Sequence, residues 1–329
     1  MKIQAQTDMP LISDSSYRAP WLFRQAHLNT IFPALFRRVQ ALPYQRETIP
    51  TPDGDFLDID WIKTGNSRLL IGLHGLEGDT NSSYLQGILG YFSNRGWDAL
   101  GMNFRSCGGR MNTRLRTYNM GESNDLHHVV AYALTQGYQE IVLTGFSLGG
   151  NVLLKYLGES ASLLSSAIKG AVAFSVPCHI PSANVAIAHW ENKLYLMRFL
   201  RTLNAKMRTK VKQFPDYLQL PDRMPRSFQE FDGQFTAPIH GYRNAADYWE
   251  SCSSIHFLPN INLPVLLINA EDDTFLAPPC YPRELAKTHP FLHLETPQYG
   301  GHCGFYSPQA DGSYWTERRA FAFIQAIMA

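Results

Sequence analysis

The feature that most constrains this chain is a serine set between glycines, in the motif GFSLG at residues 145–149. A buried-strand pattern leads directly into the motif and a helical pattern follows it. Where a strand turns at once into a helix, the central residue is strained and projects its side chain above the sheet. Gly145 and Gly149 satisfy the need for small residues where the turn passes close to itself. The motif therefore predicts a strand–turn–helix unit with Ser147 as an exposed nucleophile, the alternative being a glycine-rich turn with a bystander serine.

Strand-like and helix-like segments alternate along most of the chain. Such alternation predicts a mostly parallel sheet with helices on both faces and functional loops at the carboxyl ends of the strands. Together with the serine turn, it predicts an α/β fold class, namely the α/β-hydrolase fold with a central sheet flanked by helices and an inserted helical cap. The expected strands lie at 69–75, 97–104, 140–146, 170–176, 264–270 and 291–296, and the main helices at 82–94, 122–136, 151–159 and 315–329.

The chain is expected to comprise an arm, a core and an insertion. Its first residues are rich in Pro, aromatic residues and Arg, which predicts an arm packed on the core with a short helix near Leu28–Arg37. The turn Pro52-Asp53-Gly54 joins two strand-like runs and predicts a hairpin. The expected division is 1–44 for the N-terminal arm, 45–178 and 251–329 for the core, and 179–250, which has no clear strand pattern, for the cap.

Composition argues against several kinds of partner. The chain has 329 residues and a formal net charge of +1, so no global field attracts nucleic acid. Five widely spaced cysteines without a CxxC pair favour a reducing compartment over a disulfide framework or metal–thiolate site. The sequence shows neither a secretory signal pattern nor an apolar run long enough to span a bilayer. We expect a cytoplasmic protein without metal or cofactor; the sequence leaves its oligomeric state open.

A base and an acid are expected downstream of Ser147, in the order Ser, Asp, His that this fold uses. His302 lies in the run GGHCG after the last strand-like segment, where glycines leave room for the imidazole to reach the serine. The strand-like run at 264–270 ends in Glu271, Asp272 and Asp273. We favour Asp273 as the acid that accepts the Nδ1–H of the base and fixes its tautomer. Asp272 is the alternative, and the surplus carboxylates would be solvated or cap the next helix.

Two backbone amides must meet the negative oxygen of a tetrahedral intermediate. Leu148, directly after the serine, is expected to supply one. The other is expected from Leu76, because the loop HGLEG at 74–78 follows a strand and resembles the HG-x-x-G loop of esterases. The alternative is a turn that needs glycine only for its backbone. His74 is interpreted as a brace for this loop, and Gly75, Gly145 and Gly149 as its small supporting neighbours.

In their order, these motifs resemble the YheT-like branch of the α/β hydrolases, from about Pro20 to the C-terminus. The resemblance implies hydrolysis of carboxylic esters, and some relatives look like phospholipases or medium-chain esterases. The family usually has Gly before His27 and Gln after Leu28, where this chain has Ala26 and Asn29. The matching pieces are AHLNTI at 26–31, HGLEG at 74–78, NFRSCGG at 103–109, GFSLGGN at 145–151, FDGQFTAPIHGYRNAADYW at 231–249, PVLLINAEDDTF at 264–275 and GGHCGF at 300–305.

The leading functional hypothesis is a serine hydrolase that cleaves a small-molecule carboxylic ester, with a short, medium or lipid-like acyl group, through an acyl-enzyme. Acyl transfer to an alcohol at the same site is an alternative that sequence does not separate. A non-catalytic binding protein of this fold is disfavoured because the triad positions and both oxyanion loops are intact. A dehalogenase or epoxide hydrolase would place Asp at position 147.

Two segments carry further expectations. Arg105, in the run NFRSCGGR, is expected to brace the oxyanion loop or Glu122, or to form an ion pair in a structural turn. The segment 192–214 predicts an amphipathic cap helix with much of its apolar set on one face and its cations on the other. One interpretation is a packed helix with a solvated basic face. The sharper hypothesis is an acyl pocket beneath the cap, with cations near an anionic head group or membrane surface. The apolar set is Leu194, Leu196, Met197, Phe199, Leu200, Leu203 and Met207, and the cations are Lys193, Arg198, Arg201, Lys206, Arg208, Lys210 and Lys212.

Overall fold

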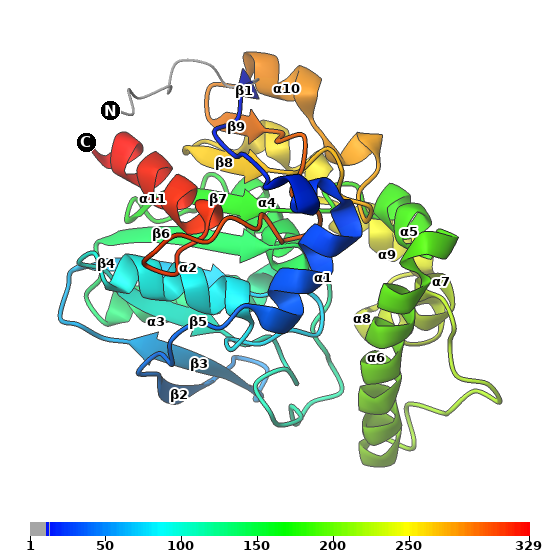
Figure 1. Ribbon diagram of the computed structural model, residues 1–329. Coiled ribbons are helices and arrows are strands. Elements are labelled where there is room, and N and C mark those ends of the chain that lie inside the picture. Colours follow the sequence, from blue (N-terminus) through cyan, green and yellow to red (C-terminus); the bar gives the residue numbers. More distant parts are fainter. Residues whose placement is uncertain (1–10, 13) are drawn as a thin grey trace.

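A single nine-stranded sheet forms the centre of the molecule (Figure 1). The computed structural model describes residues 11–12 and 14–329, so the first ten residues of the predicted arm, and residue 13, lie outside the described part. The strands are β1 (Leu11–Ile12), β2 (Gln45–Pro50), β3 (Phe56–Ile62), β4 (Arg68–Leu73), β5 (Asp98–Met102), β6 (Glu140–Phe146), β7 (Ile168–Phe174), β8 (Val265–Ile268) and β9 (Leu292–Glu295).

The sheet is mostly parallel, as predicted. Its strand order is β1-β9-β8-β7-β6-β4-β5-β3-β2. Among the strands of the described residues, only the pairs β2/β3 and β3/β5 are antiparallel. The first of these is the predicted hairpin, and Gly54 in its turn has φ 75°, a left-handed conformation that glycine adopts without a steric penalty. The α/β-hydrolase fold class expected from the alternating pattern is confirmed.

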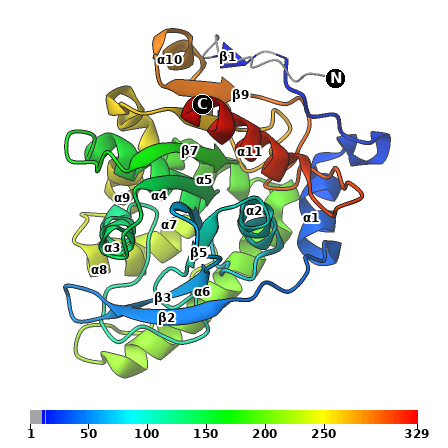
Figure 2. The same ribbon diagram turned by 90° about the vertical axis from the view of Figure 1, so that its left-hand side faces the viewer.

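Helices cover both faces of this sheet (Figure 2). Apolar side chains of α2 and α11 form one buried cluster with the sheet, and those of α3 and α4 form another on the opposite face. The central strands are therefore buried on both sides, which explains why their sequences are almost continuously apolar. The helices outside the insertion are α1 (Ala26–Phe36), α2 (Ser83–Ser93), α3 (Ser123–Thr135), α4 (Leu148–Glu159), α10 (Arg283–Thr288) and α11 (Trp315–Met328).

A group of helices lies between β7 and β8 in the chain and stands beside the sheet, at the right of Figure 1. Polar side chains start several of these helices by accepting backbone N–H groups: His179 for α5, Ser227 for α7 and Asn244 for α9. The helices are α5 (Ile180–Ala188), α6 (Lys193–Gln213), α7 (Phe228–Phe231), α8 (Ala237–His240) and α9 (Ala245–Cys252). A 3₁₀ turn, η2 (Trp190–Asn192), precedes α6, and a π-helical segment, η3 (Asp232–Thr236), joins α7 to α8.

The N-terminal segment packs against the C-terminal half of the molecule. Its helix α1 begins two residues before the predicted start, because the Gln25 side chain accepts the N–H of Leu28. A short helical turn, η1 (Trp21–Arg24), precedes it. Strand β1 pairs with β9 at the sheet edge and was not predicted, since two residues are too few to show a period. Further short turns are η4 (Ser254–His256), η5 (Leu258–Asn260) and η6 (Pro278–Cys280).

Candidate active site

The turn at Ser147 joins β6 directly to α4. Ser147 has φ 52° and ψ −118°, a strained conformation for a residue with a side chain. The space around the turn explains the two glycines. A Cβ on Gly145 would lie 2.6 Å from the carbonyl oxygen of Gly149, and a Cβ on Gly149 would lie 2.4 Å from that of His74. No larger residue fits at either position without moving the backbone.

The structure brings His302 and Asp273 to this serine. The Nε2 of His302 lies 2.9 Å from Ser147 Oγ, and its Nδ1 lies 2.8 Å from an Asp273 carboxylate oxygen. Asp273 is buried, and its second oxygen accepts the N–H of Phe275 at 3.0 Å. The Phe275 ring stacks on the imidazole with centroids 4.3 Å apart. The imidazole is therefore held at both nitrogens and on one face.

The neighbouring carboxylates do other things. Asp272 accepts the N–H of Gly301 at 2.9 Å and so holds the loop that carries His302. Burial raises the pKa of Asp272 to about 6. Glu271 forms an ion pair with Arg283 at 2.6 Å. Of the three acids at this strand end, Asp273 is the one in contact with the histidine, as the sequence favoured.

The electrostatics of His302 are dominated by two opposing influences. Burial disfavours the imidazolium, but the charge of Asp273, together with Cys303, outweighs it and raises the pKa of His302 above its ordinary value. A carboxylate that stabilises the protonated ring makes the neutral ring a stronger base. The arrangement suits a group that must take a proton from a hydroxyl.

The loop after β4 lies against the serine turn. A Cβ on Gly75 would be 3.3 Å from Ser147 Cβ, so the two segments are in contact. His74 is fully buried; its Nδ1 lies 2.7 Å from the carbonyl oxygen of Gly75 and its Nε2 accepts the N–H of Phe104. Burial lowers the pKa of His74 to about 4, so the ring is neutral. It contacts its own loop and Phe104 and not the serine, and its role as a brace stays a prediction.

Two amides next to the serine are free to donate. Within residues 11–12 and 14–329, neither the N–H of Leu76 nor that of Leu148 has a hydrogen-bond partner. Leu148 is the first residue of α4, where amides are free and the helix dipole favours negative charge. Leu76 lines the same cavity as Ser147. The sequence predicted these two amides as donors to an oxyanion, and that role stays a prediction.

A contact that no sequence pattern predicted holds the Leu76 loop from the side of α6. Glu77 has φ 55°, and its carboxylate accepts from Lys206 Nζ at 2.7 Å and from the hydroxyl of Tyr118 at 2.6 Å. Tyr118 also accepts the N–H of Glu77. Burial disfavours the ammonium of Lys206, but Cys107 and Glu77 raise its pKa, so it remains charged. Because Lys206 lies far along the chain on α6, no local pattern announces this pairing.

Helix α1 holds the histidine loop, and no sequence pattern predicted these contacts either. The hydroxyl of Thr30 accepts the N–H of His302 at 2.9 Å, and the side chain of buried Asn29 accepts the N–H of Tyr306. A Cβ on Gly304 would lie 1.9 Å from the carbonyl oxygen of Asn29, so α1 lies directly on the loop. Asn29, where the resemblance implied Gln, is thus in contact with the loop that carries His302.

Two connected spaces meet at the serine. A cleft of about 810 Å³ opens between α1 and α6 and is lined by Ser147, Leu35, Arg38, Arg198 and other residues. A smaller space of about 70 Å³ lies beneath α5 and is mostly apolar. Both are bordered by Leu76, Phe199, Phe275, Ser147 and His302.

Helix α6 differs in part from its predicted pattern. Leu196, Leu200, Leu203 and Met207 are buried as expected, whereas Leu194 and Met197 are exposed, at 79% and 57%. Two of the expected surface cations lie on the buried side instead. One is Lys206; the other is Lys210, which donates to the carbonyl oxygens of Asn112 and Arg114. A buried ammonium fits on an apolar face when carboxylates or carbonyls receive it, and helical periodicity alone does not reveal such partners.

Arg105 does not contact the oxyanion loop or Glu122. Its guanidinium pairs with Asp125 at 2.7 Å and Asp53 at 2.6 Å, while Glu122 pairs with Arg116. Of the roles expected for Arg105, the structural ion pair is the one found. It ties the hairpin turn to the start of α3.

These features define a hydrolase of the α/β class. The chain belongs to the α/β-hydrolase fold family, whose model matches residues 68–308. In the described part of the chain, no helix is long and apolar enough to cross a bilayer, and no group of side chains is arranged to hold a metal ion.

The chain is also similar in sequence to individual esterases and phospholipases of this family. It is 32% identical to "Putative esterase YheT" of Escherichia coli over 86% of this chain and 85% of that one. It is 28% identical to mouse "Phospholipase ABHD3" over 91% of this chain and 75% of that one. The Pyrococcus furiosus esterase Pf2001 shares the fold, with a TM-score of 0.59 and 19% identity over 88% of this chain and 92% of that one. The predicted resemblance to the YheT-like branch is confirmed.

Proposed function

We propose that the protein is a serine esterase in which Ser147, His302 and Asp273 form the catalytic triad. The observation that carries the proposal is the continuous line of contacts from Asp273 through His302 to Ser147, at 2.8 and 2.9 Å. The free amides of Leu76 and Leu148 beside the serine support it. The esterase and phospholipase names of the relatives agree with hydrolysis of an ester bond.

The chemistry follows from the positions of these atoms. Ser147 Oγ attacks the ester carbonyl carbon while its proton passes to His302 Nε2. Asp273 stabilises the imidazolium, and the amides of Leu76 and Leu148 donate to the oxyanion. His302 then protonates the departing alkoxide, which leaves an acyl group on Ser147. Water repeats the sequence, with His302 again as base, and releases the acid.

The cavities supply a proposal for the substrate. We assign the acyl chain to the apolar space beneath α5 and the alcohol part to the larger cleft between α1 and α6. In this proposal, residues 179–250 act as a cap that roofs the acyl chain, and the described part of the N-terminal arm forms the opposite wall of the cleft through α1. The cleft has room for an alcohol much larger than the acyl group. Arg38 and Arg198 at its walls favour an alcohol that carries negative charge.

Active-site labelling tests the proposed nucleophile. A fluorophosphonate should add to the wild-type protein once, at Ser147, and the Ser147→Ala variant should remain unlabelled with ester hydrolysis lowered by roughly 10⁴-fold or more. Ser83→Ala is the matched control, because Ser83 lines the same cleft. An adduct on another residue, or an unlabelled wild type that hydrolyses no ester, would overturn the proposal.

A further inference from the structure

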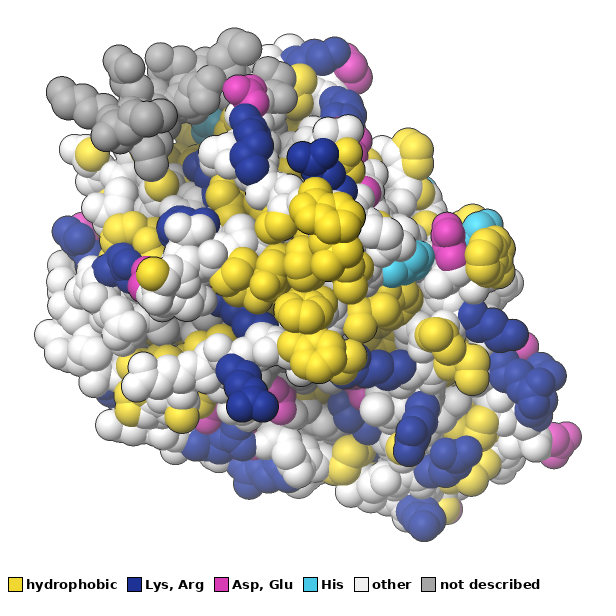
Figure 3. All heavy atoms as spheres, viewed as in Figure 1, with side chains coloured by type: hydrophobic (Ala, Val, Ile, Leu, Met, Phe, Trp, Pro, Cys, Tyr) yellow, Lys and Arg dark blue, Asp and Glu magenta, His cyan; other side chains and the backbone are white. Residues whose placement is uncertain are grey.

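The N-terminal arm displays large apolar side chains to solvent. Trp21 and Leu22 in η1 are exposed by 80% and 50%, and Leu35 and Phe36 near the end of α1 by 62% each. We call these four residues the arm patch. Figure 3 shows hydrophobic side chains gathered near the centre of the face that α1 occupies in Figure 1, with Lys and Arg side chains around them. A gathering of large apolar side chains on one face indicates an interaction site.

The arm patch stands on a firm support. Phe23, between Trp21 and Arg24, is buried and stacks on Tyr306 with centroids 3.7 Å apart. Asn29 is fully buried against the histidine loop. The buried side of the arm is thus fully used in packing, and the exposed side is presented in a fixed orientation. The same helix that holds His302 therefore also carries the patch.

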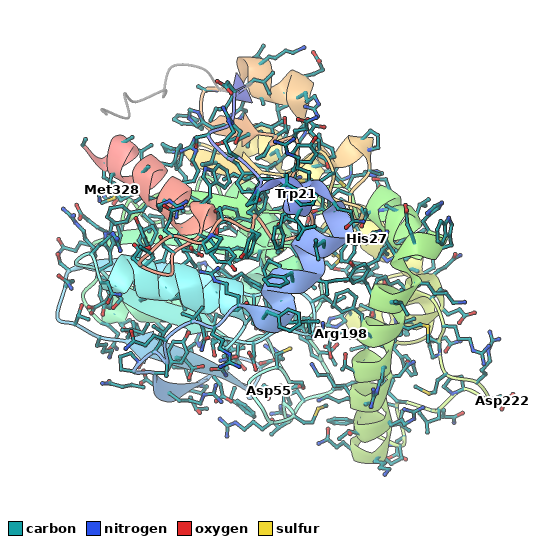
Figure 4. All side chains as sticks on the ribbon, viewed as in Figure 1. Trp21, His27, Asp55, Arg198, Asp222 and Met328 are labelled. Carbon is teal, nitrogen blue, oxygen red and sulfur yellow. The ribbon has the colours of Figure 1, made fainter. Side chains whose placement is uncertain are left out.

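The arm patch lies at the mouth of the catalytic cleft. Leu35 belongs both to the patch and to the cleft wall. On the other wall, helix α6 exposes Leu194 by 79% and Met197 by 57%. His27 of α1 contacts the hydroxyl of Tyr195 of α6 at 3.1 Å, so the two helices that form the walls are in contact at this point. Figure 4 shows Trp21 and His27 on the arm and Arg198 on α6 facing the same side of the molecule.

Three exposed arginines lie close to this apolar surface. Arg24, Arg38 and Arg198 are exposed, and in the described residues none of them forms an ion pair. Arg38 and Arg198 line the cleft, and Arg24 adjoins the patch in η1. Two acids line the same cleft, Glu77 and Asp79. Glu77 is already paired with Lys206, so among the described residues Asp79 is the one carboxylate of the cleft lining without an ion pair. The mouth of the cleft is therefore apolar and cationic together.

We propose that the arm patch and these arginines dock the protein on an anionic lipid bilayer, so that the cleft takes esters directly from the lipid surface. Trp side chains favour the bilayer interface, and nearby arginines favour anionic head groups. A symmetric contact with a second copy would instead bring the arginines of both copies together, since such an interface uses the same patch twice. The inference deepens the proposed esterase function and rests on it, because that function makes the substrate an ester.

Vesicle co-sedimentation with the full chain tests the docking surface. Wild type should bind phosphatidylcholine vesicles that contain about one third phosphatidylglycerol and bind pure phosphatidylcholine vesicles more weakly. The double variant Trp21→Ser/Phe36→Ser should bind the mixed vesicles about tenfold more weakly or worse, because each substitution removes a large apolar side chain from the interface. Leu163→Ser/Leu220→Ser is the matched control, since these leucines are also exposed, by 81% and 48%, and lie outside the patch.

Further variants and controls separate the possible outcomes of this experiment. Arg24→Gln should weaken binding to the anionic vesicles by about fivefold and leave binding to neutral vesicles unchanged. Ser147→Ala should bind vesicles like wild type, so failure of the catalytic proposal appears only as lost hydrolysis of a water-soluble ester. Circular dichroism checks that the double variant is folded. The docking proposal is wrong if wild type does not bind vesicles, if both double variants bind equally, or if the patch variant abolishes a dimer instead.

Discussion

The length of the acyl chain gives a quantitative test of how the site is divided. The space beneath α5 measures about 70 Å³ and is lined mainly by apolar residues, among them Ile180, Ala183 and Ile187. An apolar cavity of 150 Å³ holds one benzene molecule, so each carbon takes roughly 25 Å³. About three carbons therefore fit beyond the carbonyl carbon, which sits at Ser147. The structure predicts an optimum near a four-carbon acyl group.

The slope below this optimum follows from burial. Each buried methylene contributes about 0.8 kcal/mol, or a factor of about four in kcat/KM if it is fully transferred. From acetyl to butyryl the increase should therefore approach 15-fold, and chains of eight carbons or more should lose this gain because overpacking is unfavourable. The assay is kcat/KM for p-nitrophenyl esters from C2 to C12, which share one leaving group.

Replacing an alanine by phenylalanine in each space tells the two spaces apart. Ala183→Phe fills the space beneath α5 and should shift the optimum toward acetyl, whereas Ala34→Phe, on the cleft side of α1, should leave the acyl profile unchanged. Ile187→Ala enlarges the same space and should lengthen the optimum, which keeps the test valid if Ala183→Phe does not fold. A flat profile would refute the acyl pocket, and a steady rise to C10 would place the acyl chain in the large cleft.

Three further predictions concern the groups around the serine. Asp273→Asn should lower kcat by roughly 10⁴-fold, the loss that this change causes in a Ser-His-Asp protease, while Asp272→Asn should lower it far less, since only Asp273 sets the tautomer of the base. In wild type, kcat/KM should rise with pH as His302 loses its proton, with a midpoint above the ordinary histidine pKa because Asp273 raises it; Asp273→Asn should move that midpoint to lower pH. Lys206→Met should lower kcat about tenfold to a hundredfold with little change in KM, because the cation holds the loop of one oxyanion donor, and Lys212→Met, at an exposed position of the same helix, should have no effect.

Each of these has a clear contrary result. A folded Asp272→Asn protein that is less active than Asp273→Asn would exchange the roles of the two acids. A pH midpoint that does not move in Asp273→Asn would show that the carboxylate does not control the base. If Lys206→Met raised KM alone, the lysine would act in substrate binding and not in positioning the oxyanion loop.

Much of the fold was accessible from the sequence because it is written in local patterns. Continuous apolar runs of strand length predicted β4, β6, β7 and β8, because strands buried on both faces consist almost entirely of apolar residues. The serine turn was equally plain, because its two glycines are required where the backbone touches itself. The order Ser, Asp, His then pointed to Asp273 and His302, as each follows the end of a strand on the same edge of the sheet.

Only the tertiary structure decided which distant segments support this site. Thr30 and Asn29 hold the histidine loop from more than 270 positions away, and Lys206 reaches Glu77 from α6. Local patterns do not reveal such pairs. The spacing of polar residues along the sequence is the same whether a hydroxyl, an amide or an ammonium is hydrated or bonded to a buried partner. Two lysines of α6 show the consequence: helical spacing assigned both to the surface, yet Lys206 is half-buried against Glu77 and Lys210 is fully buried against backbone carbonyls.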